Sequence, residues 1–317
     1  MTFFAHARTA FKLGLVSLGC KPGDRILIPD YICDALIHPL KHLGIIPVYY
    51  PVNDQFEPFW ESLRRLVYLK PCKAIVMVHY FGQPQDILRF QRFSKTHNLF
   101  LIEDNAHGFG GRNNGRLLGT FGDIGIVSPR KILNTKYGGQ LYISGALQSM
   151  PDNMTKNTSQ MVYWAVKNLV TQWPAITNRL VRFLGRIPDC SDATSFKEPE
   201  VEDGTADWFS SWIIDRAIRG CRVDWIAKKR RQNWKLVNNI VIELGGVPGF
   251  SQVSDESSPW AYPFYTNSGK QREKLKNYLF RKGYNIFPWP ALPAEILSEG
   301  GYEDALDRWH RLLCVTL

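Results

Sequence analysis

Two stretches of the chain decide its fold: LFLIEDNAH at residues 99–107 and IGIVSPRK at residues 124–131. Each begins with an apolar run of the length of a buried strand and then turns polar. We predict strands at residues 99–102 and 124–127, which deliver their polar residues to one edge of a sheet. Ligands of open α/β sheets bind outside the carboxyl ends of the strands. The two stretches therefore mark both the sheet and a candidate site.

Outside these stretches, helical and strand-like segments alternate along the first 145 residues, separated by breaks such as KPGD at residues 21–24. The alternation predicts an α/β fold with a doubly wound, mostly parallel sheet. The expected helices cover residues 8–18, 34–43, 59–68 and 87–97, and the further strands cover residues 25–29, 45–50, 74–79 and 140–143.

The pattern changes after residue 150, where alternation gives way to longer segments. We expect a helical segment with tryptophans at 159–184, a loop at 190–204, one or two long helices at 208–244, and a small α+β unit at 259–317. We therefore divide the chain into a large α/β domain, residues 1–220, and a small C-terminal α+β domain, residues 221–317.

Composition excludes several classes of protein. Of the 317 residues, 13% are aromatic, which is enough for a folded core. The sequence has no run of about 18 apolar residues, so we expect no transmembrane helix. The first ten residues are too short and too polar for a signal peptide. Six scattered cysteines form no CxxC pair, which favours reduced thiols and a cytoplasmic location.

The charge balance, 39 Lys and Arg against 29 Asp and Glu, leaves a net charge of +10. Such a surplus suits nucleic acid, an anionic membrane or a phosphorylated ligand. The basic residues are dispersed except for KKRR at residues 228–231, which we interpret as a solvated helix face. No nucleic-acid-binding motif accompanies that run, so we expect no nucleic-acid partner.

Two kinds of site fit the sequence poorly. The glycines between residues 108 and 115 follow a strand, as in a dinucleotide-binding loop, but they lead into a predicted hairpin turn instead of a helix. His38 and His42 lie four residues apart on an expected helix and could share a metal ion. No third ligand accompanies them, so a solvated helix face explains the pair better and we predict no metal site.

A third arrangement fits better, because its parts agree in order. Asp104 ends one predicted strand and Lys131 follows another. Pyridoxal phosphate requires such a pair: the lysine forms a Schiff base and the carboxylate keeps the pyridine nitrogen protonated. Near Thr9 and Ala10 a predicted helix begins, where free backbone N–H groups can hold a phosphate. Alone, the aspartate could be a cap and the lysine a solvated residue; together they favour a cofactor site.

The same segments resemble the DegT/DnrJ/EryC/StrS family of sugar aminotransferases, fold-type I enzymes that use pyridoxal phosphate and mostly aminate nucleotide-linked keto-sugars. The resemblance runs from about residue 7 to 145 and returns more weakly at residues 230–234 and in the last sixty residues. The matching segments are KPGDRILIP (21–29), VHYFGQPQD (78–86), IEDNAH (102–107), GTFGD (119–123), Ser128, Lys131 and the glycines 138 and 139.

The resemblance implies that Lys131 forms the internal aldimine and moves the proton between the two imine positions, while Asp104 pairs with the pyridine nitrogen. Lys136 is a rival lysine, but it lies too close to the double glycine for the family pattern. His107 falls where the family has Gln or His beside the cofactor ring, although a buried core histidine is equally open.

Further cofactor contacts follow from the same resemblance. Ser128 and the backbone at Thr9 and Ala10 would hold the phosphate. Tyr31 or Cys33 would cover the ring face, and the sequence does not decide between them.

We therefore predict an aminotransferase that transfers an amino group, from glutamate by resemblance, to a keto-sugar linked to a nucleotide diphosphate, as a homodimer. The chain begins and ends early for this family, and an asparagine that the partner subunit often contributes has no match around residues 208–211. These departures keep open a catalytically impaired or regulatory relative that binds pyridoxal phosphate or a sugar nucleotide. A sugar dehydratase is a further alternative, but dehydrating members replace the lysine with histidine.

Overall fold

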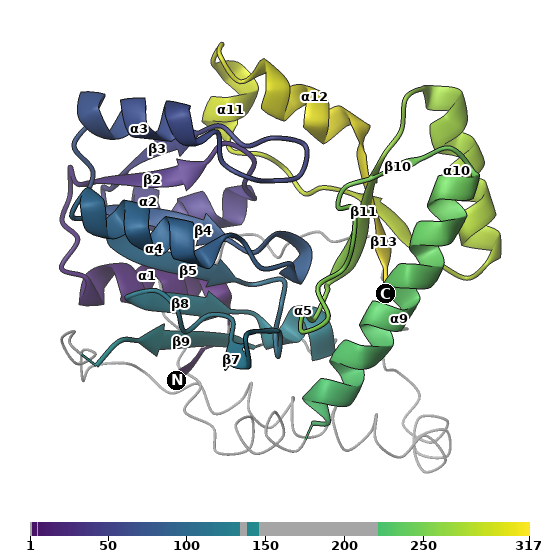
Figure 1. The fold of residues 1–317 in the computed structure, drawn as a ribbon. Coiled ribbons are helices and arrows are strands. Elements are labelled where there is room, and N and C mark those ends of the chain that lie inside the picture. The colour runs from purple at the N-terminus through teal and green to yellow at the C-terminus, as the bar shows by residue number, and fades with distance from the viewer. Residues whose placement is uncertain (1, 5, 134–137, 146–220) are drawn as a thin grey trace, which may run out of the picture.

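The computed structural model describes residues 2–4, 6–133, 138–145 and 221–317. These residues form a large sheet flanked by helices and a smaller sheet with helices of its own (Figure 1). The expectations for residues 159–184, 190–204 and 208–211, and the rival lysine Lys136, fall outside the described residues.

The large sheet has seven strands in the order β1-β9-β8-β5-β4-β2-β3. All neighbours from β3 to β8 pair in parallel, whereas β9 runs antiparallel to both β8 and β1. The predicted α/β fold with a mostly parallel sheet is confirmed. The strands are β1 (Thr2–Phe4), β2 (Arg25–Pro29), β3 (Ile46–Tyr50), β4 (Ala74–Val78), β5 (Phe100–Asn105), β8 (Ile124–Val127) and β9 (Gly139–Ile143).

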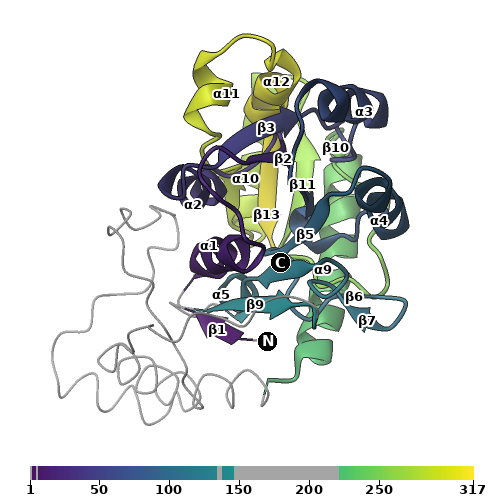
Figure 2. The same ribbon diagram turned by 90° about the vertical axis from the view of Figure 1, so that its left-hand side faces the viewer.

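Helices cover both faces of this sheet (Figure 2). α1 (Ala7–Ser17) and α2 (Ile37–His42) lie on one face, and α3 (Trp60–Leu69) and α4 (Ile87–Thr96) lie on the other. Every residue of β4 is buried, as expected for a central parallel strand covered on both sides.

The helix expected at residues 34–43 is shorter than predicted. A 3-10 turn at Asp34–Leu36 precedes α2, which begins only two residues before Pro39. Proline lacks a backbone N–H and is tolerated in the first turn of an α-helix but not in its interior. A continuous helix from residue 34 would have placed Pro39 in that interior.

β5 is longer than the predicted strand at residues 99–102. Its pairing with β8 continues to Asn105, which lies opposite Val127. Glu103 and Asp104 are therefore inside the strand and not after it. Because successive side chains of a strand point to opposite faces, the two carboxylates are directed to opposite sides of the sheet.

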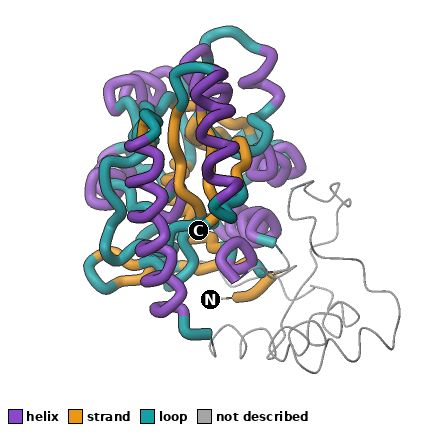
Figure 3. The backbone as a smooth tube through the Cα atoms, turned by 90° about the vertical axis from the view of Figure 1, so that its right-hand side faces the viewer, coloured by secondary structure: helices purple, strands orange, loops and turns teal. Residues whose placement is uncertain are grey.

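The smaller sheet is antiparallel throughout, in the order β10-β11-β13-β12. The long helix α9 (Val223–Glu243) and α10 (Gly269–Arg281) pack with it around a second apolar core (Figure 3). The predicted α+β unit is thus present, and the domain boundary at residue 220 stays a prediction. The other elements are β10 (Val247–Pro248), β11 (Ala261–Tyr265), β12 (Ile286–Pro288), α11 (Ala294–Ser298), α12 (Glu303–Arg311) and β13 (Leu312–Thr316).

Hydrogen bonds join the smaller sheet and its helices to the carboxyl-end loops of the large sheet. The backbone N–H of Trp260 donates to the carbonyl of Phe81 over 3.1 Å. Nη2 of the buried Arg308 donates to the Val52 carbonyl over 2.7 Å. The C-terminal part of the chain is consequently fixed beside the edge where the parallel strands end.

The interpretation of the basic run at residues 228–231 as a solvated helix face is wrong for two of its four residues. Lys228 and Lys229 are exposed on α9, but Arg230 and Arg231 are half-buried. Arg230 donates to the carbonyl of Leu317 and Arg231 to that of Ser257, each over 2.6 Å. The helical period turns these two arginines toward the smaller sheet, where they bond partly buried carbonyl groups.

Other sequence expectations can be checked in the same way. The glycines after β5 lead into a hairpin of β6 (Arg112–Asn113) and β7 (Arg116–Leu117), as predicted. The two residues at its tip have positive φ angles of 50° and 75°, as a tight hairpin turn needs.

His38 pairs with Asp34 over 3.0 Å. No helix among the described residues is long and apolar enough to cross a membrane.

We predict that Gly125→Ala destabilises the large sheet. A methyl group at Gly125 would overlap the carbonyl of Gly119, which is backbone and has little freedom to move. Overpacking of this kind costs about 1–3 kcal/mol of unfolding free energy, which urea titration measures. Gly300→Ala is the matched control, because its new methyl group would meet no atom within 4 Å. Equal stability of the two variants would contradict the packing described here.

Candidate active site

A pocket lies at the carboxyl ends of β4, β5 and β8. The start of α1, the loop after β2 and Trp289, just beyond β12, form its other walls. Its lining residues include the histidines, charged residues and serine His6, Arg8, His79, Asp104, His107, Ser128, Arg130 and Lys131. The pocket is therefore built from segments more than a hundred residues apart in the sequence.

Four of the predicted site residues line this pocket together. Asp104 comes from β5, His107 from the turn after it, Ser128 from the end of β8, and Lys131 from the short helix α5 (Pro129–Leu133). They meet because β5 and β8 are parallel neighbours, which end at the same edge.

The start of α1 lies at the pocket one residue earlier than predicted. Ala7 and Arg8 line the pocket, and Thr9 follows them in the first helical turn. Ala10 is fully buried in the core, and its N–H donates to the carbonyl of His6 over 3.2 Å. Because this bond belongs to the helix, Ala10 has no N–H to offer a ligand.

Of the two residues left open for the ring face, Cys33 lines the pocket and Tyr31 does not. Tyr31 is fully buried, with its ring 5.0 Å from that of Trp289 and 5.8 Å from that of Phe56. Packing against Trp289 and Phe56 thus holds the tyrosine in an aromatic cluster, while the cysteine lines the pocket.

Glu103 and Asp104 occupy different environments. Asp104 faces the pocket, and its Oδ1 accepts the N–H of Ala106 over 2.8 Å. Burial raises the pKa of Asp104, although the Ala106 N–H and the nearby charge of Lys131 oppose the rise. Within this pair of carboxylates, Asp104 is thus the one placed to meet a ligand.

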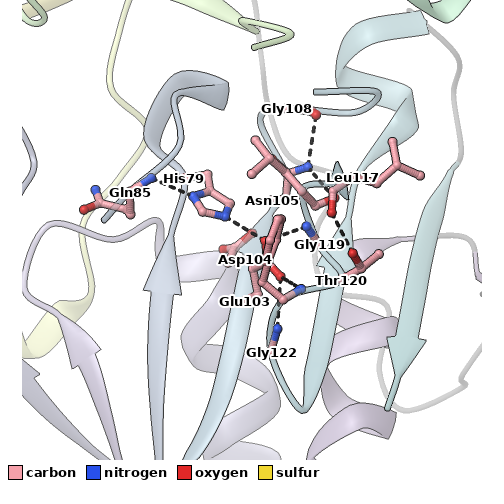
Figure 4. A network of polar contacts seen from close by, with 12 residues as sticks. His79, Gln85, Glu103, Asp104, Asn105, Gly108, Leu117, Gly119, Thr120 and Gly122 are labelled. Atoms are coloured by element: carbon pink, nitrogen blue, oxygen red, sulfur yellow. Dashed lines mark hydrogen bonds and ion pairs between the residues drawn. The ribbon is translucent and has the colours of Figure 1, made fainter. Parts of the chain in front are cut away.

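Glu103 points away from the pocket into a polar network (Figure 4). Its carboxylate accepts the backbone N–H groups of Gly119, Phe121 and Gly122. It also accepts Nε2–H of His79 over 2.8 Å, while Nδ1 of His79 accepts the N–H of Gln85 over 3.0 Å. Both ring nitrogens of His79 are therefore occupied.

Burial raises the pKa of Glu103, but the bonds from His79 and from the backbone outweigh it and hold the pKa below its usual value. His79 lines the pocket with a ring whose polar atoms are already bonded elsewhere. It follows that His79 supports the strand ends.

His107 satisfies both interpretations left open by the sequence. It is buried and accepts the N–H of Phe81 at Nδ1 over 3.3 Å, as a core histidine would. It also lines the pocket. Burial, aided by the charge of Lys131, lowers its pKa well below the usual value, so the ring is neutral. Its proton then resides on Nε2, which can act as a donor.

The side of the pocket nearest α1 is electropositive. Arg8 and Arg130 both line it. Burial, aided by the charges of Arg130 and Arg8, lowers the pKa of His6 to about 3. The close approach that forms this wall depends on Gly139, where any Cβ would overlap the backbone of His6 and Ala7. The double glycine thus lets β9 pass against the start of α1.

Sequence reasoning missed several pocket residues. Arg8 and Arg130 are direct neighbours of predicted site residues, so extending the predicted segments by one position would have found them. Trp289 lies in the last sixty residues and carries no local signal, because only tertiary packing brings it to the strand ends.

We predict that Glu103→Gln weakens the fold by about 2–4 kcal/mol at pH 7, because an amide donor then faces buried backbone donors. Since the pKa of Glu103 is depressed in the folded state, its stabilising effect is present above about pH 4.3 and is lost at lower pH. The difference in unfolding free energy between wild type and variant should therefore become smaller below about pH 4. Urea unfolding at several pH values measures it.

The control for this prediction is Glu57→Gln. Glu57 is exposed and bonds a neighbouring side chain at the surface, so this change should alter stability by less than about 0.5 kcal/mol. A Glu103→Gln protein as stable as wild type at pH 7 would show that the network does not stabilise the fold.

Comparisons with known proteins show which sequences this chain is similar to. GDP-perosamine synthase of Escherichia coli O157:H7 is 32% identical over 143 residues, which cover 44% of this chain and 39% of that protein. A dTDP-4-dehydro-2,6-dideoxy-D-glucose 3-dehydratase of Saccharopolyspora spinosa is 30% identical over 285 residues, or 86% of this chain and 58% of that protein. The chain spans about two fifths of the length of the first curated relatives it matches.

Solved structures share the fold. The PLP-form of the putative sugar aminotransferase Spr1654 from Streptococcus pneumoniae superposes with a TM-score of 0.62 at 17% identity, covering 100% of this chain and 81% of that one. This likeness confirms the predicted fold-type I architecture. Residues 4–160 match the model of one family and include β5, β8 and the residues that follow them. By these residues the chain belongs to the DegT/DnrJ/EryC1/StrS aminotransferase family.

Proposed function

We propose that the protein is a pyridoxal-phosphate-dependent aminotransferase that moves an amino group from glutamate to a keto-sugar linked to a nucleotide diphosphate. The observation that carries the proposal is the meeting of Asp104 and Lys131 in one pocket beside the start of α1. A carboxylate, a lysine and a helix N-terminus match the ring nitrogen, the carbonyl and the phosphate of this cofactor.

When bound, the cofactor supplies an aldehyde that bonds amines and a ring that accepts electrons. Asp104 would hold the proton on the ring nitrogen, and its burial leaves few competing partners for that proton. Lys131 would hold the cofactor's aldehyde carbon and, once released, its Nζ would take up and return the substrate proton. His107 would lie beside the ring with Nε2–H as donor, and Cys33 would face the ring.

The phosphate would lie at the electropositive wall. Ser128 offers a hydroxyl, Arg8 and Arg130 offer charge, and the first residues of α1 offer N–H groups that no earlier helical turn uses. Thr9 belongs to this set through its backbone, whereas Ala10 does not. The donor types of the pocket therefore fit the whole cofactor.

The substrate class rests on the relatives and on charge. Two relatives carry a nucleotide diphosphate and a sugar in their names, GDP-perosamine and dTDP-4-dehydro-2,6-dideoxy-D-glucose. A net charge of +10 suits such anionic substrates. Glutamate as donor, a homodimer and a cytoplasmic location are parts of the same proposal. The free thiols of Cys20, Cys72, Cys221 and Cys314 agree with a reducing compartment.

Dehydration of a similar sugar is the competing reaction, because the relative with 86% coverage is named a dehydratase. Residue 131 favours amine transfer. A lysine there can take part in covalent exchange with the cofactor, which a histidine cannot do. Analysis of the sugar product for nitrogen separates the two reactions.

We predict that purified protein mixed with pyridoxal phosphate absorbs visible light, that borohydride fixes the cofactor on Lys131, and that glutamate bleaches the band. The Lys131→Ala variant should lose all three properties, because the covalent anchor is gone. Peptide mapping after reduction identifies the lysine.

Lys136→Ala is the control and should behave as wild type. If Lys131→Ala still binds the cofactor covalently, another lysine is the anchor. If neither wild type nor variant binds it, the protein is a non-catalytic relative.

We predict that Asp104→Asn still binds pyridoxal phosphate but reacts with glutamate about 10²- to 10³-fold more slowly, because a neutral amide cannot hold the ring nitrogen protonated. Stopped-flow absorbance measures the rate of bleaching. Asp86→Asn serves as the control: Asp86 caps α4 outside the pocket, and asparagine caps helices equally well. An unchanged rate in Asp104→Asn would assign the ring nitrogen to another group.

A further inference from the structure

The amino group of Lys131 lies over an aromatic ring from the distant end of the chain. Its Nζ is 4.9 Å from the centroid of the Trp260 ring. Trp260 stands immediately before β11 and is 8% exposed. The distance is within the range in which an ammonium group is attracted to the face of an indole.

The Trp260 ring is held from several directions. Its backbone N–H donates to the carbonyl of Phe81 over 3.1 Å. The ring lies nearly parallel to that of Phe81, at 10° and 6.2 Å, and its centroid is 4.5 Å from that of the His107 ring. The indole is therefore a fixed surface against which the flexible side chain of Lys131 rests.

The groups around Trp260 allow its indole to attract the ammonium group of Lys131. His107, whose ring lies against Trp260, is neutral and brings no positive charge that would compete with Lys131 for the indole face. Asp104 is near enough for the charge of Lys131 to influence its pKa. Lys131 thus lies near a carboxylate and over an indole face.

We propose that Trp260 is a positioning residue for Lys131: its ring face binds the ammonium group by a cation–π interaction and fixes the lysine at the pocket wall next to His107. The contact itself does not depend on the enzymatic activity, whereas its value for catalysis rests on the proposed function. The smaller sheet, which carries Trp260, would in this way set the position of a residue delivered by the large sheet.

Chemical modification of Lys131 tests the proposal on the full chain freed of cofactor. A lysine-specific reagent is added at fixed pH, and mass spectrometry follows the peptide that contains Lys131. The cation–π attraction protects the ammonium form, which does not react. In Trp260→Leu the rate should therefore rise by about threefold to thirtyfold, the range that corresponds to such interactions. Trp260→Phe keeps a ring face and should retain much of the protection.

Two comparisons distinguish the cation–π attraction of Lys131 to Trp260 from a change in the access of the reagent to Lys131. Leucine and phenylalanine both open space beside the lysine, so equal acceleration in the two variants would mean that access alone changed, and the proposal would be overturned. A Trp260→Leu rate equal to wild type would overturn it as well. Trp234→Leu also removes a buried indole from the C-terminal part, away from Lys131, and should leave the rate unchanged.

The outcome is independent of the pyridoxal phosphate experiments. If Lys131 carries no cofactor but reacts as described here, the contact with Trp260 stands and the proposed function fails. If Lys131 carries the cofactor and the Trp260 variants react like wild type, the proposed function stands and the positioning role fails.

Discussion

The buried carboxylate of Glu103 is the group on which the geometry of the strand ends depends. It has no exposed surface, and a charge in that position is tolerable only when several donors surround it. The donors come from His79 after β4 and from the loop before β8, so a single charge ties three segments of the sheet edge together. Neither the loop nor His79 can move without leaving that charge unsatisfied.

The same constraint gives Asp104 its place. Glu103 is committed to one face of the sheet, and strand geometry then directs Asp104 to the other, where β8 and the start of α1 form the pocket. Two adjacent carboxylates thereby acquire different tasks. One is saturated with hydrogen bonds and serves the fold, while the other accepts one N–H within the described hydrogen bonds and remains able to meet a cation.

Local sequence patterns made much of the fold and of the pocket predictable. The strands, the helices on both sheet faces and the hairpin after β5 follow from period and turn residues within about ten positions. Ligands of open α/β sheets bind at the carboxyl ends of the strands, and this rule pointed to Asp104, His107, Ser128 and Lys131. Some failures have local causes, such as Pro39 in the helix expected at 34–43, but most depend on packing between distant segments. Examples are Cys33 lining the pocket instead of Tyr31, the buried half of the basic run on α9, and the indoles of Trp260 and Trp289.

These distant segments also explain why the pocket is an electrostatically sensitive place. The large sheet alone would present Asp104, Lys131 and two arginines at an open edge, where water would screen them. The aromatic residues brought by the smaller sheet replace part of that water with low-dielectric surface. Charges there interact more strongly, which strengthens the attraction of Lys131 to Asp104 and to the indole of Trp260. The pocket is therefore built by both parts of the chain: the large sheet supplies its charged groups, and the smaller sheet supplies aromatic surface beside them.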